Sequence, residues 1–229
     1  MNFYSIWEAV LKDNIDDSTF IESFLKKTNS SRDVLLNGTE DEMLQIFNFL
    51  NKYDIDKMID KIDSSYLSVI DPNMVIQFSS FEIGIKDVIS ILKQFGNLTF
   101  DEIGKYLLGE RDLLAMKKYG ENHSKLAQIF DLVELSNKKP ITVSLTSLGR
   151  FCSMMDFRSE QRMLRILALR DPLIRNIIYR SKTGKCKYIS ETSCLSESTQ
   201  IRRRSNVKTL IDFILTNSNY EYLLENIEW

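Results

Sequence analysis

Hydrophobic residues in the first 65 positions recur three and four residues apart, the spacing of one face of an α-helix. Four such repeats occur, formed by Trp7, Val10 and Leu11; by Phe20, Ile21, Phe24 and Leu25; by Met43, Ile46, Phe47 and Leu50; and by Ile55, Met58, Ile59 and Ile62. Breaks are expected at residues 28–31 and at Asn37-Gly38. We therefore predict a helical N-terminal region over residues 1–82, with a turn at Asp71-Pro72 and a short strand over 74–78.

A more compact pattern occupies residues 83–157. A helix over 88–95 should end at Gly96, and Thr99 with Glu102 forms a capping box that begins a short helix over 100–108. Helices over 113–118 and 121–130, separated by Gly120, should precede a β-hairpin of 132–135 and 141–145. Thr146 and Ser147 would cap a further helix.

Helix, short helix, helix and hairpin is the order of a winged helix-turn-helix. In that arrangement the helix over 121–130 contacts bases and the hairpin contacts the DNA backbone. We expect the helix to present four polar side chains outward: Asn122, Ser124, Lys125 and Gln128. Lys138 and Lys139 lie at the hairpin tip, where they would contact phosphates.

A second, weaker copy of this pattern spans residues 158–229. Hydrophobic positions predict helices before and after Asp171-Pro172, a break at Thr183-Gly184, and a short helix over 188–194. A long helix follows over 196–215, and alternation over 220–224 predicts a short strand that could serve as a second wing. The predicted fold class is therefore mainly α, with tandem winged helices and small β-hairpin wings.

The long helix over 196–215 combines an apolar rear half with a polar and basic front. Its candidate DNA-contacting residues are Ser198, Thr199, Gln200, Arg202, Arg203, Arg204 and Asn206. Arg pairs with guanine in the major groove, and Asn and Gln pair with adenine. With Val207 on the buried side, helical geometry points Arg202 and Arg203 furthest outward and places Arg204 nearest the core. The alternative is a surface helix whose arginines are simply solvated.

The net charge of −2 hides an uneven distribution of acidic and basic residues along the chain. Residues 1–90 hold 16 acidic and 8 basic side chains, a net of −8, whereas residues 158–208 hold 4 and 13, a net of +9. The basic segment is where a phosphate backbone would bind, and the acidic region should avoid DNA. A basic segment that is buried or split across faces would instead favour a protein-interaction scaffold.

Sequence features argue against several other classes. No apolar run reaches the ~18 residues that cross a bilayer, and no signal-peptide pattern begins the chain. Cys152, Cys186 and Cys194 share no metal spacing and are expected to be reduced cytosolic thiols. His123 is the only histidine, so we expect neither a metal site nor a cofactor.

Several segments resemble the winged-helix recognition regions of restriction endonucleases, especially type IIS enzymes. The similarity covers about residues 88–215 and is carried by residues 119–133, 145–149, 198–204, 207–208 and 210–211. The resemblance implies base contacts at Asn122, Ser124, Lys125, Gln200, Arg202 and Arg203. The chain departs from such whole enzymes in being short.

No catalytic centre for DNA cleavage is apparent in the sequence. Restriction folds hold Mg²⁺ with an acidic residue and a (D/E)-x-K pair, but no Asp or Glu stands two positions before any Lys. His123, Lys125 and Asp131 imitate the H-x-K-x4-D motif of another nuclease class, with one residue too many in the gap. No glycine-rich phosphate-binding loop occurs.

The sequence therefore favours a cytoplasmic protein that binds a specific duplex DNA sequence without catalytic residues of its own. It would be the recognition module or subunit of a restriction endonuclease, with a nuclease domain or subunit as a further partner. A winged-helix transcriptional regulator and a protein-interaction scaffold remain as alternatives.

Overall fold

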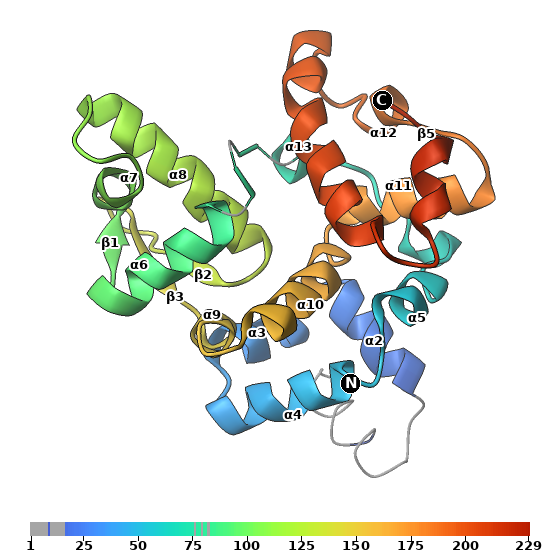
Figure 1. Ribbon diagram of the computed structural model, residues 1–229, viewed down its shortest axis with the longest axis horizontal. Helices are drawn as coiled ribbons and strands as arrows, with labels where there is room; N and C mark the ends of the chain where they lie inside the picture. The colour runs from blue at the N-terminus through green and yellow to red at the C-terminus, as the bar shows by residue number, and fades with distance from the viewer. Residues whose placement is uncertain (1–8, 10–16, 76, 79, 82) are drawn as a thin grey trace. The chain divides into compact units, whose positions relative to one another are not determined.

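The computed structural model describes residues 9, 17–75, 77–78, 80–81 and 83–229 (Figure 1). The predicted helix marked by Trp7 lies outside these residues. The chain forms two compact units that are interleaved along the sequence. Unit 1 comprises Met1–Ser31, Phe47–Ile76 and Gln161–Trp229, and unit 2 comprises Arg32–Ile46 and Gln77–Glu160. The predicted domains are consecutive segments with boundaries after residues 82 and 157, and these boundaries stay a prediction.

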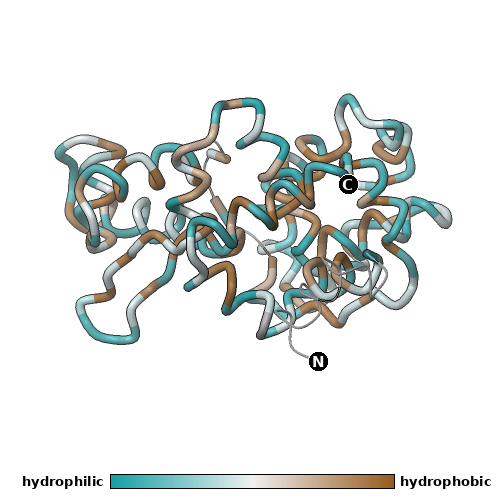
Figure 2. Tube along the Cα trace, turned by 90° about the horizontal axis from the view of Figure 1, so that it is seen from below, coloured by the Kyte–Doolittle hydropathy of each residue, from teal (hydrophilic) through white to brown (hydrophobic). Residues whose placement is uncertain are grey.

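The fold is mainly helical, as predicted, and hydrophobic and hydrophilic stretches alternate along the trace (Figure 2). The N-terminal helices are α2 (Asp17–Leu25), α3 (Asn29–Asn37), α4 (Glu40–Leu50) and α5 (Ile55–Asp60). The break expected over residues 28–31 is shorter than predicted. Thr28 Oγ1 accepts a hydrogen bond from the Ser31 N–H at 3.3 Å, so the polar residues begin α3 instead of forming a loop.

In unit 2 a π-helical turn, η3 (Ile83–Asp87), leads into α6 (Val88–Phe95). The predicted end of α6 at Gly96 is confirmed, with a φ of 79° that favours glycine. Helix α7 (Phe100–Leu108) begins at the predicted capping box, where the Glu102 carboxylate accepts the Thr99 N–H at 2.7 Å. The predicted helix after the hairpin is α9 (Ser147–Cys152), capped by Thr146.

The two helices predicted on either side of Gly120 are wrong, because α8 runs unbroken from Leu113 to Ile129. Gly120 serves packing instead. A Cβ there would lie 1.9 Å from the Phe100 carbonyl oxygen, and one at Gly104 would lie 1.9 Å from the Met116 carbonyl oxygen. The two glycines therefore allow the backbones of α7 and α8 to approach more closely than side chains would permit.

A three-stranded antiparallel sheet completes unit 2. Strands β1 (Leu98–Thr99), β2 (Val133–Leu135) and β3 (Thr142–Leu145) lie in the order β1-β3-β2, and β2 and β3 form the predicted hairpin. Buried side chains of α6, α7, α8 and the sheet form one core, comprising Val88, Leu92, Leu98, Phe100, Ile103, Ala127, Val133 and Val143. The sheet thus holds the hairpin against the three helices.

Unit 1 is built from helices drawn from both ends of the chain. To α2 and α5 it adds η1 (Ser64–Tyr66), η2 (Pro72–Met74), α11 (Pro172–Thr183), β4 (Cys186–Lys187), α12 (Tyr188–Glu191), α13 (Glu197–Leu215), η4 (Glu221–Asn226) and β5 (Ile227–Glu228), with most of α10 (Phe157–Ala168). The Asp171 cap and Pro172 at the start of α11 are confirmed. The apolar rear of α13 is buried as predicted, at Val207, Leu210, Ile211, Ile214 and Leu215.

The strands predicted over 74–78 and 220–224 are wrong in the described residues, and residue 76 of the first lies outside them. Residues 72–74 form the 3-10 turn η2, whose Asp71 cap accepts the Asn73 N–H, so Met74 does not start a strand. Residues 221–224 belong to the 3-10 helix η4. Tyr222 is exposed and Leu223 is buried, which is not the alternation expected of the predicted strand. The strand that follows, β5, pairs in parallel with β4.

Candidate nucleic-acid interface

Helix α8 carries the first group of predicted DNA-contacting residues. Its buried face consists of Gly120, His123, Ser124, Leu126 and Ala127. The expectation that Ser124 points outward is wrong: the residue is 0% exposed. It lies one turn after Gly120, on the face of α8 that is buried inside unit 2. The buried face of α8 is therefore wider than predicted and includes Ser124 beside Leu126 and Ala127.

His123 is likewise buried in α8. Its Nδ1 lies 2.8 Å from the Tyr119 carbonyl oxygen, and its ring packs against the Tyr119 ring with 4.1 Å between centroids. Burial lowers the pKa of this imidazole below its usual value of 6.5. His123 therefore belongs to the core of unit 2 and is not placed to act on a substrate.

The other predicted residues of α8 reach its surface. Lys125 is exposed and forms an ion pair with Glu121 one turn earlier, while Asn122 and Gln128 are half-buried. An exposed pair of this kind contributes little stability and leaves Lys125 free to exchange partners. These three residues keep the position that the sequence predicts.

The N-terminal half of α8 holds two basic side chains that are not among the predicted DNA-contacting residues. Lys117 and Lys118 are both exposed, and Leu113 and Leu114 in the first turn are 63% and 73% exposed. Asp112 caps this turn by accepting the Ala115 N–H at 3.1 Å. The signal was present as a Lys-Lys pair in an amphipathic stretch, but the predicted break at Gly120 assigned it to a separate helix.

The loop between β2 and β3 holds the second group of predicted residues. Lys138 and Lys139 are exposed at its tip. Ser136 Oγ accepts the Thr142 N–H at 2.9 Å and donates to the Lys138 carbonyl at 3.2 Å, which ties the base of the loop together. The pair of lysines is therefore presented by a defined turn at the end of a hairpin.

In unit 1, α12 and α13 meet through Gln200, and the expectation that Gln200 faces a groove is wrong. The residue is 6% exposed. Its Nε2 donates to the Ile189 and Thr192 carbonyl oxygens at 3.0 and 2.7 Å, and Tyr188 donates to the Gln200 carbonyl at 3.1 Å. Since these bonds satisfy carbonyls at the end of α12, Gln200 fixes the angle between the two helices.

The three arginines at the front of α13 differ from the prediction in which of them is exposed and which contacts the protein. Arg202 and Arg204 are exposed, so Arg204 does not brace the core. The Arg203 side chain instead points toward η2, where its Nη1 donates to the Pro72 and Val75 carbonyl oxygens at 2.9 and 2.7 Å. Val207 is one helical turn beyond Arg203, so the buried stripe extends to Arg203 and not to Arg204.

The remaining predicted residues of α13 lie at its first turns. Ser198 is exposed, and Thr199 is half-buried and accepts a hydrogen bond from Ser196 Oγ at 3.0 Å. Asn206 is half-buried. Of the residues predicted on this helix, Ser198, Arg202 and Arg204 are therefore the exposed donors.

Many cations of the basic segment bind the protein's own backbone. Six of the 13 basic side chains in residues 158–208 donate to main-chain carbonyls of unit 1: Arg162, Arg165, Arg170, Arg175, Lys182 and Arg203. Most of these carbonyls end helices, where they lack intrahelical partners and carry partial negative charge. Burial lowers the pKa of Lys182, while Asp60 and Asp63 oppose that shift. Nearly half of the basic side chains in residues 158–208 therefore bind main-chain carbonyls of unit 1 itself.

The described residues contain no group of three or more His, Cys, Asp or Glu side chains that could hold a metal ion. Of the helices in the described ranges, none is long and apolar enough to cross a membrane. The chain matches no protein-family model, no curated protein and no solved structure.

Proposed function

We propose that the chain binds a specific duplex DNA sequence, with unit 2 acting as a winged-helix module. The observation that carries this proposal is the order α6–β1–α7–α8–β2–β3 together with the sheet order β1-β3-β2. In a winged helix-turn-helix the third helix enters the major groove and the hairpin touches the backbone. Helix α8 and the β2–β3 loop occupy these two places.

The side chains at both places suit a polyanion. Lys117 and Lys118 are exposed on α8, and Lys138 and Lys139 are exposed at the loop tip. Base contacts would fall to the predicted polar side chains of the same helix that reach its surface, Asn122, Lys125 and Gln128. The basic hairpin would supply contacts that fix orientation without sequence information.

Unit 1 would contribute a second, similar element. The short helix α12 precedes the long helix α13 much as α7 precedes α8, and a strand stands before each short helix. Arg202 and Arg204 would contact DNA from the exposed side of α13. Tandem units of this kind support the role predicted from resemblance, a recognition module or subunit of a restriction endonuclease whose cleavage centre lies in another chain or domain.

The test is a salt titration with the whole chain. Duplexes selected from a random pool would be measured by fluorescence anisotropy at increasing KCl, beside a scrambled duplex. The double variant Lys117→Ala, Lys118→Ala should weaken binding and lower the slope of log K against log salt by about 0.9 for each phosphate that the variant no longer neutralises. The matched control is Lys57→Ala, Lys61→Ala, which removes two exposed lysines of unit 1. Binding that is absent, insensitive to salt or equally affected by both variants would contradict the proposal.

One observation favours a second candidate, a protein-interaction scaffold. Six cations of the basic segment are engaged with backbone carbonyls, so this segment offers a phosphate backbone less charge than its sequence suggests. A scaffold would show no selected duplex in the same experiment. A transcriptional regulator would bind DNA equally well in this experiment. Mg²⁺-dependent cutting of plasmid DNA would instead indicate an intact nuclease.

A further inference from the structure

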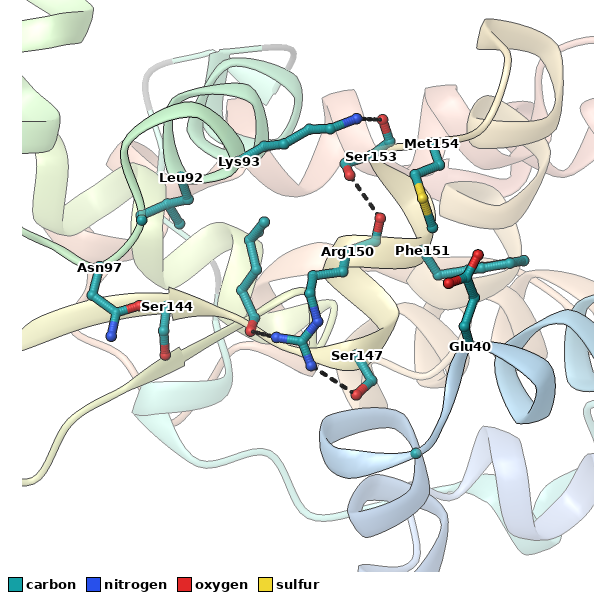
Figure 3. A pocket seen from close by; sticks show the side chains of 13 residues that line it. Glu40, Leu92, Lys93, Asn97, Ser144, Ser147, Arg150, Phe151, Ser153 and Met154 are labelled. Carbon is teal, nitrogen blue, oxygen red and sulfur yellow. Dashed lines mark hydrogen bonds between the residues drawn. The ribbon is translucent and has the colours of Figure 1, made fainter.

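Unit 2 contains a pocket that the proposed DNA interface does not use. Its volume is about 750 Å³, and it lies among the end of α6, strand β3, helix α9 and the turn before α4 (Figure 3). Pockets of 300–1,000 Å³ are typical of small-molecule sites. All of its lining residues belong to unit 2, so one folded unit forms the whole pocket.

Arg150 lies in the wall of this pocket, where two hydrogen bonds orient its exposed side chain. Its Nη1 donates to the Leu145 carbonyl oxygen at 2.9 Å, and its Nη2 donates to Ser147 Oγ at 3.0 Å (Figure 3). A guanidinium has five N–H donors. The Nε of Arg150 makes no hydrogen bond with the described part of the chain, so donors remain available on a guanidinium that two hydrogen bonds already orient.

The polar groups around Arg150 give the pocket a positive balance. Lys93 crosses toward α9 and donates to the Ser153 carbonyl oxygen at 2.9 Å. Glu40, from the first turn of α4, is the one carboxylate among the lining residues. Two cations against one anion leave a net charge of +1, which attracts a ligand of opposite sign.

The rest of the lining is apolar or neutral. Leu92, Leu145, Phe151 and Met154 supply hydrocarbon surface, and Ser144 and Asn97 add neutral hydrogen-bonding groups. The lining thus combines apolar surface with polar groups that can orient a small ligand. A guanidinium with free donors beside aromatic and aliphatic side chains suits a molecule with an anionic end and an apolar body.

We propose that this pocket binds a small anionic molecule, whose carboxylate or phosphate group pairs with Arg150 while its apolar body lies against Phe151 and Met154. The proposal goes beyond DNA binding and does not depend on it. Carboxylate and phosphate share the chemistry that Arg150 recognises. The experiment separates the two.

The probes are benzoate, phenyl phosphate and benzamide, which is the neutral isostere of benzoate. The Met154 methyl group, followed by NMR of the whole chain labelled at methionine methyl carbons, reports occupancy from the pocket itself. At least one anion should shift this signal saturably with a dissociation constant of about 1 mM or below. Benzamide should bind at least tenfold more weakly. A larger response to benzoate or to phenyl phosphate identifies the preferred group.

Variants then assign the interaction. Arg150→Gln should weaken anion binding at least tenfold, whereas the matched control Arg158→Gln, an exposed arginine outside the pocket, should leave it unchanged. Glu40→Gln should tighten binding, because it removes the opposing carboxylate. That prediction keeps the test decisive even if Arg150→Gln does not fold. Failure of both anions to shift Met154, equal binding of benzamide, or no tightening with Glu40→Gln would overturn the proposal.

Discussion

The close approach of α7 and α8 predicts that Gly120→Ala destabilises unit 2, although alanine favours helices. The added Cβ would meet the Phe100 carbonyl oxygen at 1.9 Å and the Gly104 nitrogen at 2.9 Å. Both are main-chain atoms of α7, so no rotamer change can relieve the overlap. The two helices would have to separate, and the core behind them would pack less tightly.

Two opposing contributions set the size of the effect. Alanine is more favourable than glycine in a helix interior by about 1 kcal/mol. Overpacking costs about 1–3 kcal/mol, and the upper end applies because the backbone itself must move. We therefore expect Gly120→Ala to lower the free energy of unfolding by about 2 kcal/mol. In a chain of this length that corresponds to a fall of about 4–8 °C in the melting temperature.

Thermal unfolding followed by circular dichroism measures this change, and amide hydrogen exchange in α7 and α8 locates it. The matched control is Gly184→Ala, where no atom lies within 4 Å of the added Cβ. Its stability should change by no more than about 0.5 kcal/mol. Adding Gly104→Ala to Gly120→Ala should cost less than the sum of the two, since one separation relieves both overlaps. A Gly120→Ala protein as stable as the original would refute the close packing.

Further predictions concern unit 1, the hairpin and pH. Gln200→Ala should lower the free energy of unfolding by about 1–3 kcal/mol, because it strands buried carbonyls of α12, and chemical denaturation measures this. Arg203→Ala should destabilise unit 1 without relaxing DNA sequence preference, and loss of preference alone would contradict its structural role. Lys138→Ala with Lys139→Ala should weaken all duplexes equally and lower the salt slope by roughly two. The pKa of His123 is lower in the folded protein than in the unfolded chain, so the unfolded state binds more protons and stability falls as pH drops below 6.5. Urea titrations should show a smaller fall for His123→Gln, and equal falls would contradict the assignment.

Local signals in the sequence predicted several helix ends correctly. Gly96, the capping box of Thr99 and Glu102, and the Asp171-Pro172 start are each satisfied within a few residues, so they need no knowledge of the rest of the fold. The β2–β3 hairpin was recognisable for the same reason. Its lysines lie at the tip as predicted.

Errors arose where the partner of a residue is distant in sequence. Glycine often breaks a helix, so Gly120 suggested a break. Only the proximity of the Phe100 carbonyl shows that glycine is needed there for α7 and α8 to pack closely. Gln200 has the chemistry of an adenine contact, but carbonyls of α12 take its donors. Arg203 cannot be distinguished from Arg202 by residue type. The helical phase could be assigned only once the Pro72 and Val75 carbonyls were known to lie beside it.

The backbone contacts of Arg170 and Arg175 have a consequence for synthesis of the chain. Arg170 Nε donates to the Phe24 carbonyl at 3.0 Å, across 146 residues of sequence, and Arg175 donates to the Leu25 carbonyl. At ~5–20 residues per second the ribosome needs about 7–30 s to make the intervening chain. During this time the Phe24 and Leu25 carbonyls at the end of α2 lack their two arginine partners, although Phe20 can already pack against Phe49. All of unit 2 is synthesised in that interval, so unit 2 can fold before Arg170 and Arg175 join α2 to the later helices of unit 1.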